Sequence, residues 1–363
     1  MLEIQRDEIT VSERLCIGIF SVVYEGQWRC SNIALKVLRC VSGGAAFESL
    51  EAELDLLSQL RHPRILTLMG VCTNINRPEG NVALVMERME QGSLYNILHD
   101  SDELLPCTTL NYMKRIRLAV DIADGMRFLH HSGVVHKDLR SGHVLVGSDG
   151  RAKISDFGLA RYTEIALRTT DPRLLLSRTT AFPVAWSAPE LIRGDAGITH
   201  AIDSFSFGVI IWELLTGEIP WKSMSIQQIT AAVGYGKRLS LSARTAEDFP
   251  DVSHVMAKCF LDTKYRPAFS DLYNELSLFL TEIIKLQEAK TKRYIPDTFI
   301  CCIGYEVMQD PVICADGHSY ERDNIVLWLK QSNHSPRTNL LLPHKMLIPN
   351  YALKELIEDA NLR

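Results

Sequence analysis

Two aspartates, Asp138 and Asp156, flank a short predicted hairpin and could together perform phosphate chemistry. Residues 144–146 and 151–154 are predicted to be short strands, and the Gly-Ser-Asp-Gly segment 147–150 between them is typical of a tight turn. One carboxylate could orient a hydroxyl nucleophile, and the other could hold Mg²⁺ through hard oxygen ligands. The alternative is that both are ordinary solvated acids beside a turn.

Residues 136–158 resemble the catalytic loop and Asp-Phe-Gly motif of protein kinases, H-R-D-L-x-x-x-N followed by D-F-G. The resemblance implies that Asp138 accepts or orients the proton of the substrate hydroxyl and that Asp156 holds Mg²⁺. Two positions depart from the pattern, because Lys137 replaces the usual arginine and His143 replaces the usual metal-binding asparagine. Imidazole is a poorer Mg²⁺ ligand than an amide oxygen, so His143 is the weaker of the two metal-ligand candidates.

Earlier parts of the chain contain further elements of the kinase pattern. Lys36 lies in a predicted strand, residues 33–38, and matches the V-A-I-K signature, so the resemblance implies that it pairs with the α- and β-phosphates. Apolar residues at spacings of three and four predict a helix over residues 45–60, and Glu53 beside its apolar stripe is the candidate partner of Lys36. Alone, each could be an ordinary surface residue.

The predicted adenine site lies at the hinge between two lobes, in the segment 82–94. The resemblance implies that backbone groups of Glu87 and Met89 bind adenine, while a glycine-rich turn covers the phosphates. Gly18 is the one glycine that remains of the three in that turn. The predicted nucleotide-binding set is Leu15, Gly18, Val23, Ala34, Lys36, Glu87, Met89 and Leu145. Its apolar members are ordinary core residues on any other interpretation.

The carboxyl-terminal part of this pattern adds an Ala-Pro-Glu segment that ends at Glu190, a strongly apolar helix that runs to residue 215, and Arg266. Asp203 is the predicted N-cap of that helix, and the resemblance implies an ion pair between Arg266 and Glu190. The resemblance further implies that the polar segment 159–187 is the activation loop. It therefore implies an α+β, bilobal protein kinase fold over residues 8–280, with the N-lobe ending at about residue 86 and the C-lobe starting at about residue 90.

A basic helical linker, residues 281–294, is predicted to lead to a second domain at 295–363. The cysteines and histidines of this second domain lack the paired spacing of a zinc site, which favours a zinc-free core that includes Trp328. Its D-P-V, G-H-S-Y-E-R and I-P-N motifs resemble the U-box, the zinc-free relative of RING ubiquitin ligases. The resemblance implies that Ile303, Tyr305 and Pro336 dock a ubiquitin-conjugating enzyme. A degenerate U-box that serves only as a dimerising or adaptor domain is the alternative.

Composition excludes several other classes of protein. The 363 residues carry a net charge of −5 without a long basic run, so no nucleic-acid partner is expected. Apolar runs are interrupted well before 18 residues, so no membrane span is expected. Nine cysteines without framework spacing suit a reducing intracellular compartment, which predicts a cytoplasmic location, with the nucleus as the alternative.

Two hypotheses follow for the first domain. The first is an ATP- and Mg²⁺-dependent protein kinase, Ser/Thr favoured over Tyr, coupled to a U-box ubiquitin ligase that acts on protein substrates. The second is a catalytically silent pseudokinase that recruits substrates or partners to the U-box. The missing glycines and His143 favour the second hypothesis, whereas Lys36, Glu53, Asp138 and Asp156 oppose it.

Overall fold

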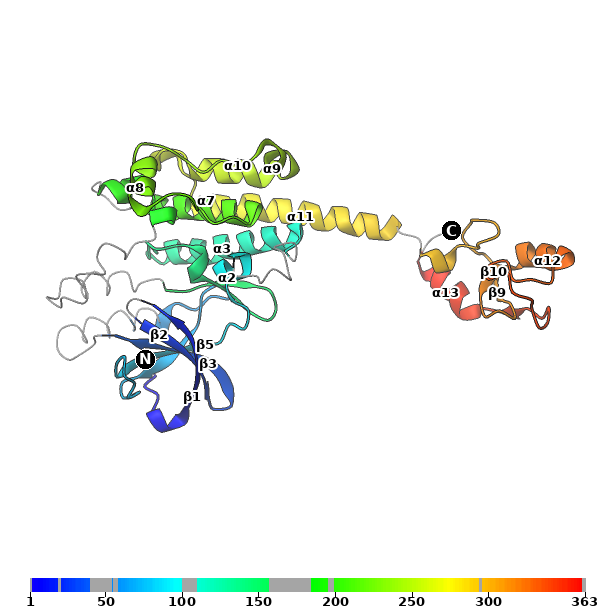
Figure 1. Cartoon of the computed structure of the whole chain (residues 1–363), viewed down its shortest axis with the longest axis horizontal. Coiled ribbons are helices and arrows are strands. Elements are labelled where there is room, and N and C mark those ends of the chain that lie inside the picture. Colours follow the sequence, from blue (N-terminus) through cyan, green and yellow to red (C-terminus); the bar gives the residue numbers. More distant parts are fainter. Residues whose placement is uncertain are drawn as a thin grey trace. The chain divides into compact units, whose positions relative to one another are not determined.

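The computed structural model describes residues 2–18, 21–39, 54, 58–99, 110–156, 184–194, 199–286 and 296–360, together with the backbone of 287–293 (Figure 1). Glu53, most of the predicted helix 45–60 and residues 157–183 lie outside this part of the chain. Contacts between Cα atoms divide the chain into two compact units, Met1–Leu280 and Thr281–Arg363. Helix α11 (Phe269–Arg293) runs through most of the predicted linker, and the exact domain boundaries remain predictions.

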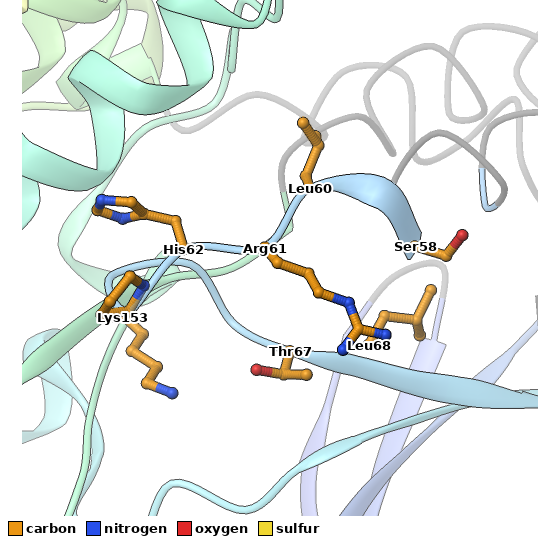
Figure 2. A pocket seen from close by; sticks show the side chains of 8 residues that line it. Ser58, Leu60, Arg61, His62, Thr67, Leu68 and Lys153 are labelled. Atoms are coloured by element: carbon orange, nitrogen blue, oxygen red, sulfur yellow. The ribbon is translucent and has the colours of Figure 1, made fainter.

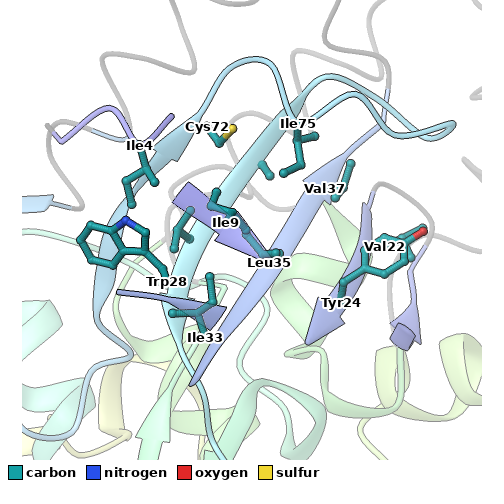
Figure 3. Packing of buried hydrophobic residues seen from close by; sticks show 12 residues of the cluster. Ile4, Ile9, Val22, Tyr24, Trp28, Ile33, Leu35, Val37, Cys72 and Ile75 are labelled. Atoms are coloured by element: carbon teal, nitrogen blue, oxygen red, sulfur yellow. The ribbon is translucent and has the colours of Figure 1, made fainter. Parts of the chain in front are cut away.

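The first unit begins with a short 3-10 helix, η1 (Arg6–Glu8), and an antiparallel sheet of five strands in the order β1-β2-β3-β5-β4. The strands are β1 (Ile9–Ile17), β2 (Ser21–Trp28), β3 (Ser31–Leu38), β4 (Leu68–Cys72) and β5 (Val82–Glu87). Side chains alternate along β3, so Ile33, Leu35 and Val37 are fully buried in the core shown in Figure 3. Lys36 therefore points to the opposite face of the sheet, which is the face required for a phosphate-binding lysine.

The rest of the first unit is mainly helical. Its helices are α2 (Leu94–His99), α3 (Tyr112–His131), α6 (Pro189–Arg193), α7 (Ala201–Thr216), α8 (Ile226–Gly234), α9 (Ala243–Asp248), α10 (Pro250–Cys259) and α11. Helix α7 lies between α3 and α10 (Figure 1) and is buried on all sides from Ile202 to Leu215, which explains its nearly uniform apolar sequence. It ends at Gly217, whose φ of 70° is a left-handed conformation that favours glycine.

Short elements carry the predicted site residues. Strands β6 (Gly92–Ser93), β7 (Val144–Val146) and β8 (Ala152–Ile154) form a small sheet, and the 3-10 helix η3 (Ser141–His143) leads into β7. The predicted hairpin is thus confirmed, with Val144 paired to Ile154. Two further 3-10 helices are η5 (Val184–Trp186) and η6 (Thr263–Tyr265).

The predicted ion pair between Glu190 and Arg266 is present. The guanidinium of Arg266 donates to both carboxylate oxygens of Glu190, at 2.5 and 3.0 Å, and also to the carbonyl oxygens of Leu261 and Ala201 at 2.8 and 3.1 Å. The pair is buried and joins α6 to the start of α7 and the segment before α11. It ties the residues after the activation segment to the rest of the helical lobe.

The second unit contains the 3-10 helix η7 (Asp297–Phe299), strands β9 (Pro311–Ile313), β10 (Ser319–Glu321) and β11 (Ile348–Pro349), and helices α12 (Arg322–Gln331) and α13 (Tyr351–Asp359). Val312, Ile325 and Leu329 are buried in its core, as predicted. Trp328 is not, since 37% of its surface is exposed and its indole N–H donates to the carbonyl oxygen of His334 at 2.8 Å. The prediction of Trp328 as a core residue is therefore wrong, because α12 turns that position outward.

Asp316 organises the loops of the second unit. Its carboxylate accepts hydrogen bonds from the hydroxyls of Tyr320 and Ser335, at 2.6 and 2.5 Å, and from the backbone N–H of His318 at 3.0 Å. Burial alone would raise the pKa of this carboxyl group, but the donated hydrogen bonds outweigh it and hold the pKa below its ordinary value. The ionised Asp316 thus fixes the segment that follows Ser335.

The cysteines of the second unit pack in its hydrophobic core. Cys301 and Cys314 are buried, and the Cys301 sulfur accepts a hydrogen bond from the backbone N–H of Glu321 at 3.3 Å. Within the described ranges, no three histidine, cysteine or acidic side chains are grouped as a metal site would require. The zinc-free character of the domain stays a prediction. None of the helices in the described part of the chain is both long and apolar enough to span a bilayer.

Candidate active site

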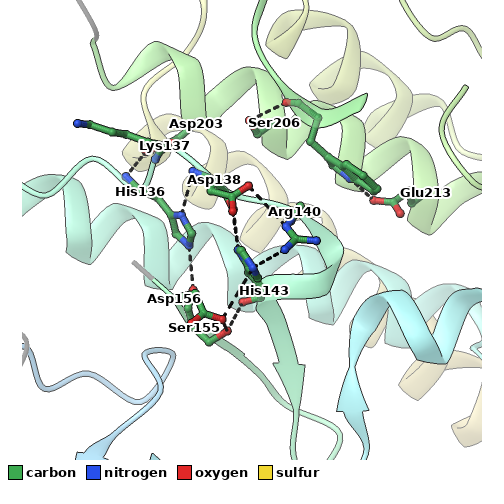
Figure 4. A network of polar contacts seen from close by, with 11 residues as sticks. His136, Lys137, Asp138, Arg140, His143, Ser155, Asp156, Asp203, Ser206 and Glu213 are labelled. Atoms are coloured by element: carbon green, nitrogen blue, oxygen red, sulfur yellow. Dashed lines mark hydrogen bonds and ion pairs between the residues drawn. The ribbon is translucent and has the colours of Figure 1, made fainter. Parts of the chain in front are cut away.

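Asp203 anchors the loop that carries Asp138. Its carboxylate accepts hydrogen bonds from the backbone N–H groups of His136 and Lys137, at 2.8 and 2.9 Å (Figure 4). It also accepts a hydrogen bond from Nε2–H of His130 at 2.8 Å. Helix α7 begins at Ala201, with His200 as its N-cap, so the predicted N-cap role of Asp203 is wrong. The carboxylate satisfies donors of the catalytic loop instead of donors of its own helix.

His136 connects this loop to the end of the hairpin. The side chain is fully buried, and because its Nε2 lies 3.0 Å from the carbonyl oxygen of Ser155, Nε2 must be the donor. Its Nδ1 then accepts a hydrogen bond from the backbone N–H of Asp138 at 3.3 Å. The neutral imidazole therefore couples the positions of the two predicted site aspartates, Asp138 and Asp156.

Lys36 and Asp156 come together across the two lobes. The Lys36 ammonium forms an ion pair with Asp156 Oδ1, so residues 120 positions apart in sequence meet in one site. Burial would raise the pKa of Asp156, but the Lys36 ammonium opposes this and holds the pKa well below its ordinary range. The carboxylate is therefore ionised at neutral pH, which fits a hard divalent cation. Asp156 is the described residue best suited to hold Mg²⁺.

The predicted partner of Lys36, Glu53, lies outside the described residues. Asp138 lies on the other side of the loop, with Oδ1 3.5 Å from Arg140 Nε and Oδ2 3.4 Å from His143 Nδ1. Its carboxylate is partly exposed, as a group that must meet a substrate hydroxyl requires. These contacts fix the direction of the carboxylate without burying it.

His143 lies between the two aspartates, in the centre of Figure 4. Its side chain is 13% exposed, with Nε2 3.8 Å from Asp156 Oδ2. Burial lowers the pKa of this imidazole to about 4, although Asp156 and Asp138 oppose the shift. A neutral imidazole whose Nε2 is 2.7 Å from Arg140 Nη2 does not fit a second Mg²⁺. The structure supports one hard-cation ligand here, Asp156.

Two of the other predicted nucleotide residues, Val23 and Ala34, share the sheet face that carries Lys36. Val23 pairs with Lys36 in the β2–β3 register, and Ala34 lies two residues before Lys36 on the same strand, so all three side chains share that face. Leu145 lies half-buried on β7, and Met89 is buried beyond β5. The structure contains no nucleotide contact that tests these assignments.

The remaining three predicted nucleotide residues are Leu15 on β1, Gly18 just after β1 and Glu87 at the end of β5. The backbone N–H of Gly18 donates to the carbonyl oxygen of Ser21 at 2.8 Å, which closes the turn between β1 and β2, and Leu15 is exposed on β1 before this turn. The Glu87 carboxylate is already engaged, because Lys153 donates to it at 2.7 Å. The backbone N–H of Glu87 donates to the carbonyl oxygen of Thr67 at 3.2 Å, so the predicted contact with adenine falls to the backbone carbonyl oxygen of Glu87.

Glu213 was missed by the sequence reasoning. It is fully buried in α7, and its carboxylate accepts hydrogen bonds from Ser141 Oγ at 2.8 Å, His99 Nε2–H at 3.1 Å and Trp186 Nε1–H at 2.7 Å. It thereby joins the catalytic loop to η5, the segment just after the activation loop. A glutamate inside a helix that is otherwise apolar was the available signal, because a buried charge requires several donors.

A pocket of about 330 Å³ lies apart from these residues (Figure 2). It is lined by Ser58, Leu60, Arg61, His62, Pro63, Thr67, Leu68 and Lys153. None of them belongs to the predicted nucleotide set, and Lys153 is neutralised by its ion pair with Glu87. The pocket is therefore separate from the candidate active site.

The three predicted docking residues lie on the second unit. Tyr305 is 82% exposed, whereas Ile303 and Pro336 are half-buried and Ile303 packs against the core. The loop that carries Pro336 is fixed from beneath, because the backbone N–H groups after it donate to Ser335 Oγ, which in turn donates to Asp316. An exposed Tyr305 and a fixed loop at Pro336 are features that suit a docking surface. The docking role of the three residues stays a prediction.

Comparison with known families gives two matches. Residues 9–276 match the model described as protein tyrosine and serine/threonine kinase, and residues 295–359 match the U-box domain. Among similar proteins, U-box domain-containing protein 70 of Oryza sativa subsp. japonica is 32% identical over 94% of this chain and 43% of its own length. U-box domain-containing protein 34 of Arabidopsis thaliana is 31% identical over 94% of this chain and 42% of its own.

A third similar protein matches over a smaller share of the chain. The probable serine/threonine-protein kinase SIS8 of Arabidopsis thaliana is 35% identical over 81% of this chain and 26% of its own length. The chain thus spans less than half the length of these curated relatives. The two U-box relatives extend the similarity through both units.

Proposed function

Because the chain belongs to the protein tyrosine and serine/threonine kinase family and ends in a U-box domain, we propose that it is a protein kinase coupled to a ubiquitin ligase. The kinase transfers the γ-phosphate of ATP to serine or threonine hydroxyls of protein substrates. The observation that supports this most strongly is the Lys36–Asp156 ion pair, since these two residues are the proposed phosphate-binding and metal-binding groups, and His143 links Asp156 to Asp138, the proposed proton acceptor. A pseudokinase would have no need to keep all three.

Each group has a defined task in the proposed reaction. Asp138 orients the substrate hydroxyl and takes its proton as the new bond forms. Lys36 contacts the phosphates, and Asp156 would hold Mg²⁺, which when bound offsets the negative charge of the phosphates. The hydrogen bonds from His136 and Asp203 position the loop, so the hydroxyl would meet a preorganised carboxylate.

The choice of serine and threonine as acceptors rests on the relatives. SIS8 is named as a probable serine/threonine-protein kinase. Arg140 and Pro183 resemble tyrosine kinases at two local positions, so the acceptor class must be tested directly.

We expect the full-length protein to gain phosphate when it is incubated with ATP and Mg²⁺, as measured by intact mass spectrometry. EDTA in excess of Mg²⁺ should prevent the gain, because without the cation the Asp156 carboxylate would repel the phosphates and their negative charge would not be offset. Fragmentation should locate the phosphates on serine or threonine. No gain with Mg²⁺ would favour the pseudokinase hypothesis, and phosphotyrosine alone would contradict the proposed acceptor class.

The second unit would act by docking and not by covalent catalysis. A ubiquitin-conjugating enzyme held on Ile303, Tyr305 and Pro336 would present its thioester to a substrate lysine, which raises the effective concentration of the reacting groups. Tyr305 is the most exposed of the three, so its ring would be largely buried on docking. ATP and charged conjugating enzymes are supplied in the cytoplasm, which we propose as its location.

We expect Tyr305→Ala to reduce ubiquitin transfer at least tenfold, since loss of a central aromatic anchor commonly costs about 2 kcal/mol or more of binding energy. The measurement is chain formation with a panel of charged conjugating enzymes. Tyr351→Ala is the matched control, because Tyr351 is also a well-exposed tyrosine of this unit, at 70%, but lies on α13. Equal loss in both variants, or none in Tyr305→Ala, would contradict this docking surface.

A further inference from the structure

The ring of His143 has both nitrogens engaged. Nδ1 lies 2.9 Å from the carbonyl oxygen of Asp138, and a carbonyl only accepts, so Nδ1 carries the hydrogen. Nε2 therefore holds the lone pair. It lies 2.7 Å from Nη2 of Arg140, and since a guanidinium only donates, Arg140 donates to His143. The one nitrogen that could bind a metal is thus already an acceptor for an arginine.

Contacts on either side hold His143 in this position. Its carbonyl oxygen accepts from the backbone N–H and the hydroxyl of Ser155, at 2.9 and 3.1 Å. Its ring is stacked on that of the buried His136, with ring centroids 6.1 Å apart and an interplanar angle of 20°. A rotation that freed Nε2 would also break the Nδ1 hydrogen bond to Asp138.

Arg140 brings a permanent positive charge to the same place. Its Nε lies 3.5 Å from Asp138 Oδ1, while Nη2 is held by His143. The guanidinium therefore lies against the proposed proton-accepting carboxylate, with an uncharged partner on its other side. A second divalent cation would meet this charge and would find no oxygen from position 143.

Resting on the proposed kinase function, we propose that the site binds one divalent cation, at Asp156, and that the Arg140 guanidinium held by His143 supplies the second positive charge. In this arrangement His143 is a positioning residue for Arg140 and not a metal ligand. The pair Arg140–His143 would then replace the metal that the usual asparagine helps to bind. The replacement of asparagine by His143 would then change which group supplies the second positive charge, and the site would keep its activity.

The test counts metal ions on the full-length protein. Mn²⁺ is titrated in the presence of the non-hydrolysable imido analogue of ATP, and free Mn²⁺ is followed by electron paramagnetic resonance. We expect one Mn²⁺ per nucleotide complex for the natural protein and two for His143→Asn, which restores an amide oxygen. Two ions in the natural protein would overturn the inference, and this result does not depend on whether the variant folds.

The count is independent of phosphate transfer, because the analogue cannot react. One ion in a protein that fails to phosphorylate would support the inference and contradict only the proposed catalysis. No bound ion would overturn both. One ion in a folded His143→Asn would show that position 143 does not set the count, and would also overturn the inference.

A coupling measurement tests the role of Arg140. Arg140→Gln should lower the phosphorylation rate on the order of 100-fold in the natural protein, the usual effect of losing one preorganised electrostatic contact. In the His143→Asn background the loss should be at least tenfold smaller at high Mg²⁺, because a second ion would supply the charge. Equal losses of phosphorylation rate in the two backgrounds would contradict the inference that Arg140 takes the place of a second metal ion.

Discussion

Replacing Asp138 with asparagine is expected to reduce the rate of phosphate transfer roughly 100- to 10,000-fold. Asparagine has almost the same shape but cannot take a proton from the substrate hydroxyl. The backbone N–H of Asp138 donates to His136, and its carbonyl oxygen accepts from His143, so both contacts persist in the variant. The loss should therefore appear in the catalytic rate, while the melting temperature and nucleotide affinity change little.

Asp149→Asn is the control for this prediction. Asp149 is an exposed acid in the turn of the same hairpin, where its carboxylate accepts from the backbone N–H of Arg151 at 2.9 Å. Asparagine can make the same contact, so the rate should stay within about twofold of the natural protein. A similar rate in Asp138→Asn and Asp149→Asn would show that Asp138 is not the proton acceptor.

Removing the guanidinium of Arg266 should give the largest loss of stability, about 3–5 kcal/mol in the free energy of unfolding. The Arg266 side chain is 1% exposed and that of Glu190 is 11% exposed. Arg266→Ala would leave the Glu190 carboxylate with no counter-ion at 2.5 Å and two backbone carbonyls without their donor. An uncompensated buried charge is far more destabilising than the intact pair is stabilising.

Urea unfolding followed by tryptophan fluorescence measures this loss, since four of the five tryptophans lie in the first unit: Trp28, Trp186, Trp212 and Trp221. Arg244→Ala is the matched control, because the side chain of Arg244 is 92% exposed and lies 3.9 Å from Asp248. We expect that change to cost less than about 1 kcal/mol.

Replacing both members of the buried ion pair, by Arg266→Met and Glu190→Gln, should lower the free energy of unfolding less than Arg266→Ala alone. A loss below 1 kcal/mol in Arg266→Ala would contradict the argument.

Local patterns predicted much of the fold and the candidate site. Strand β3 and the hairpin β7–β8 follow from apolar runs and turn residues close together in sequence, and the structure confirms them. The pair Glu190–Arg266 was expected from the resemblance to protein kinases, and the structure contains it. The α+β architecture and the order of the two domains could therefore be predicted from the sequence.

Trp328 and Asp203 show where local patterns fail. Trp328 belongs to an apolar stretch, yet the packing of α12 leaves it exposed, because burial depends on which elements cover a helix face. Asp203 has the residue type of an N-cap, but the backbone donors of the neighbouring loop compete for its carboxylate. Residue type and spacing cannot rank such competing partners.

The sequence by itself determined which chemical groups this protein has and the elements that carry them, since residue types and short-range periodicity are local properties. Only the tertiary structure decided which groups meet. It paired Lys36 with Asp156 across the two lobes, placed Glu213 beneath the catalytic loop and turned Arg140 onto His143. Those contacts depend on distances between segments far apart in the chain, and hydrogen-bond direction then assigns each nitrogen and oxygen its role.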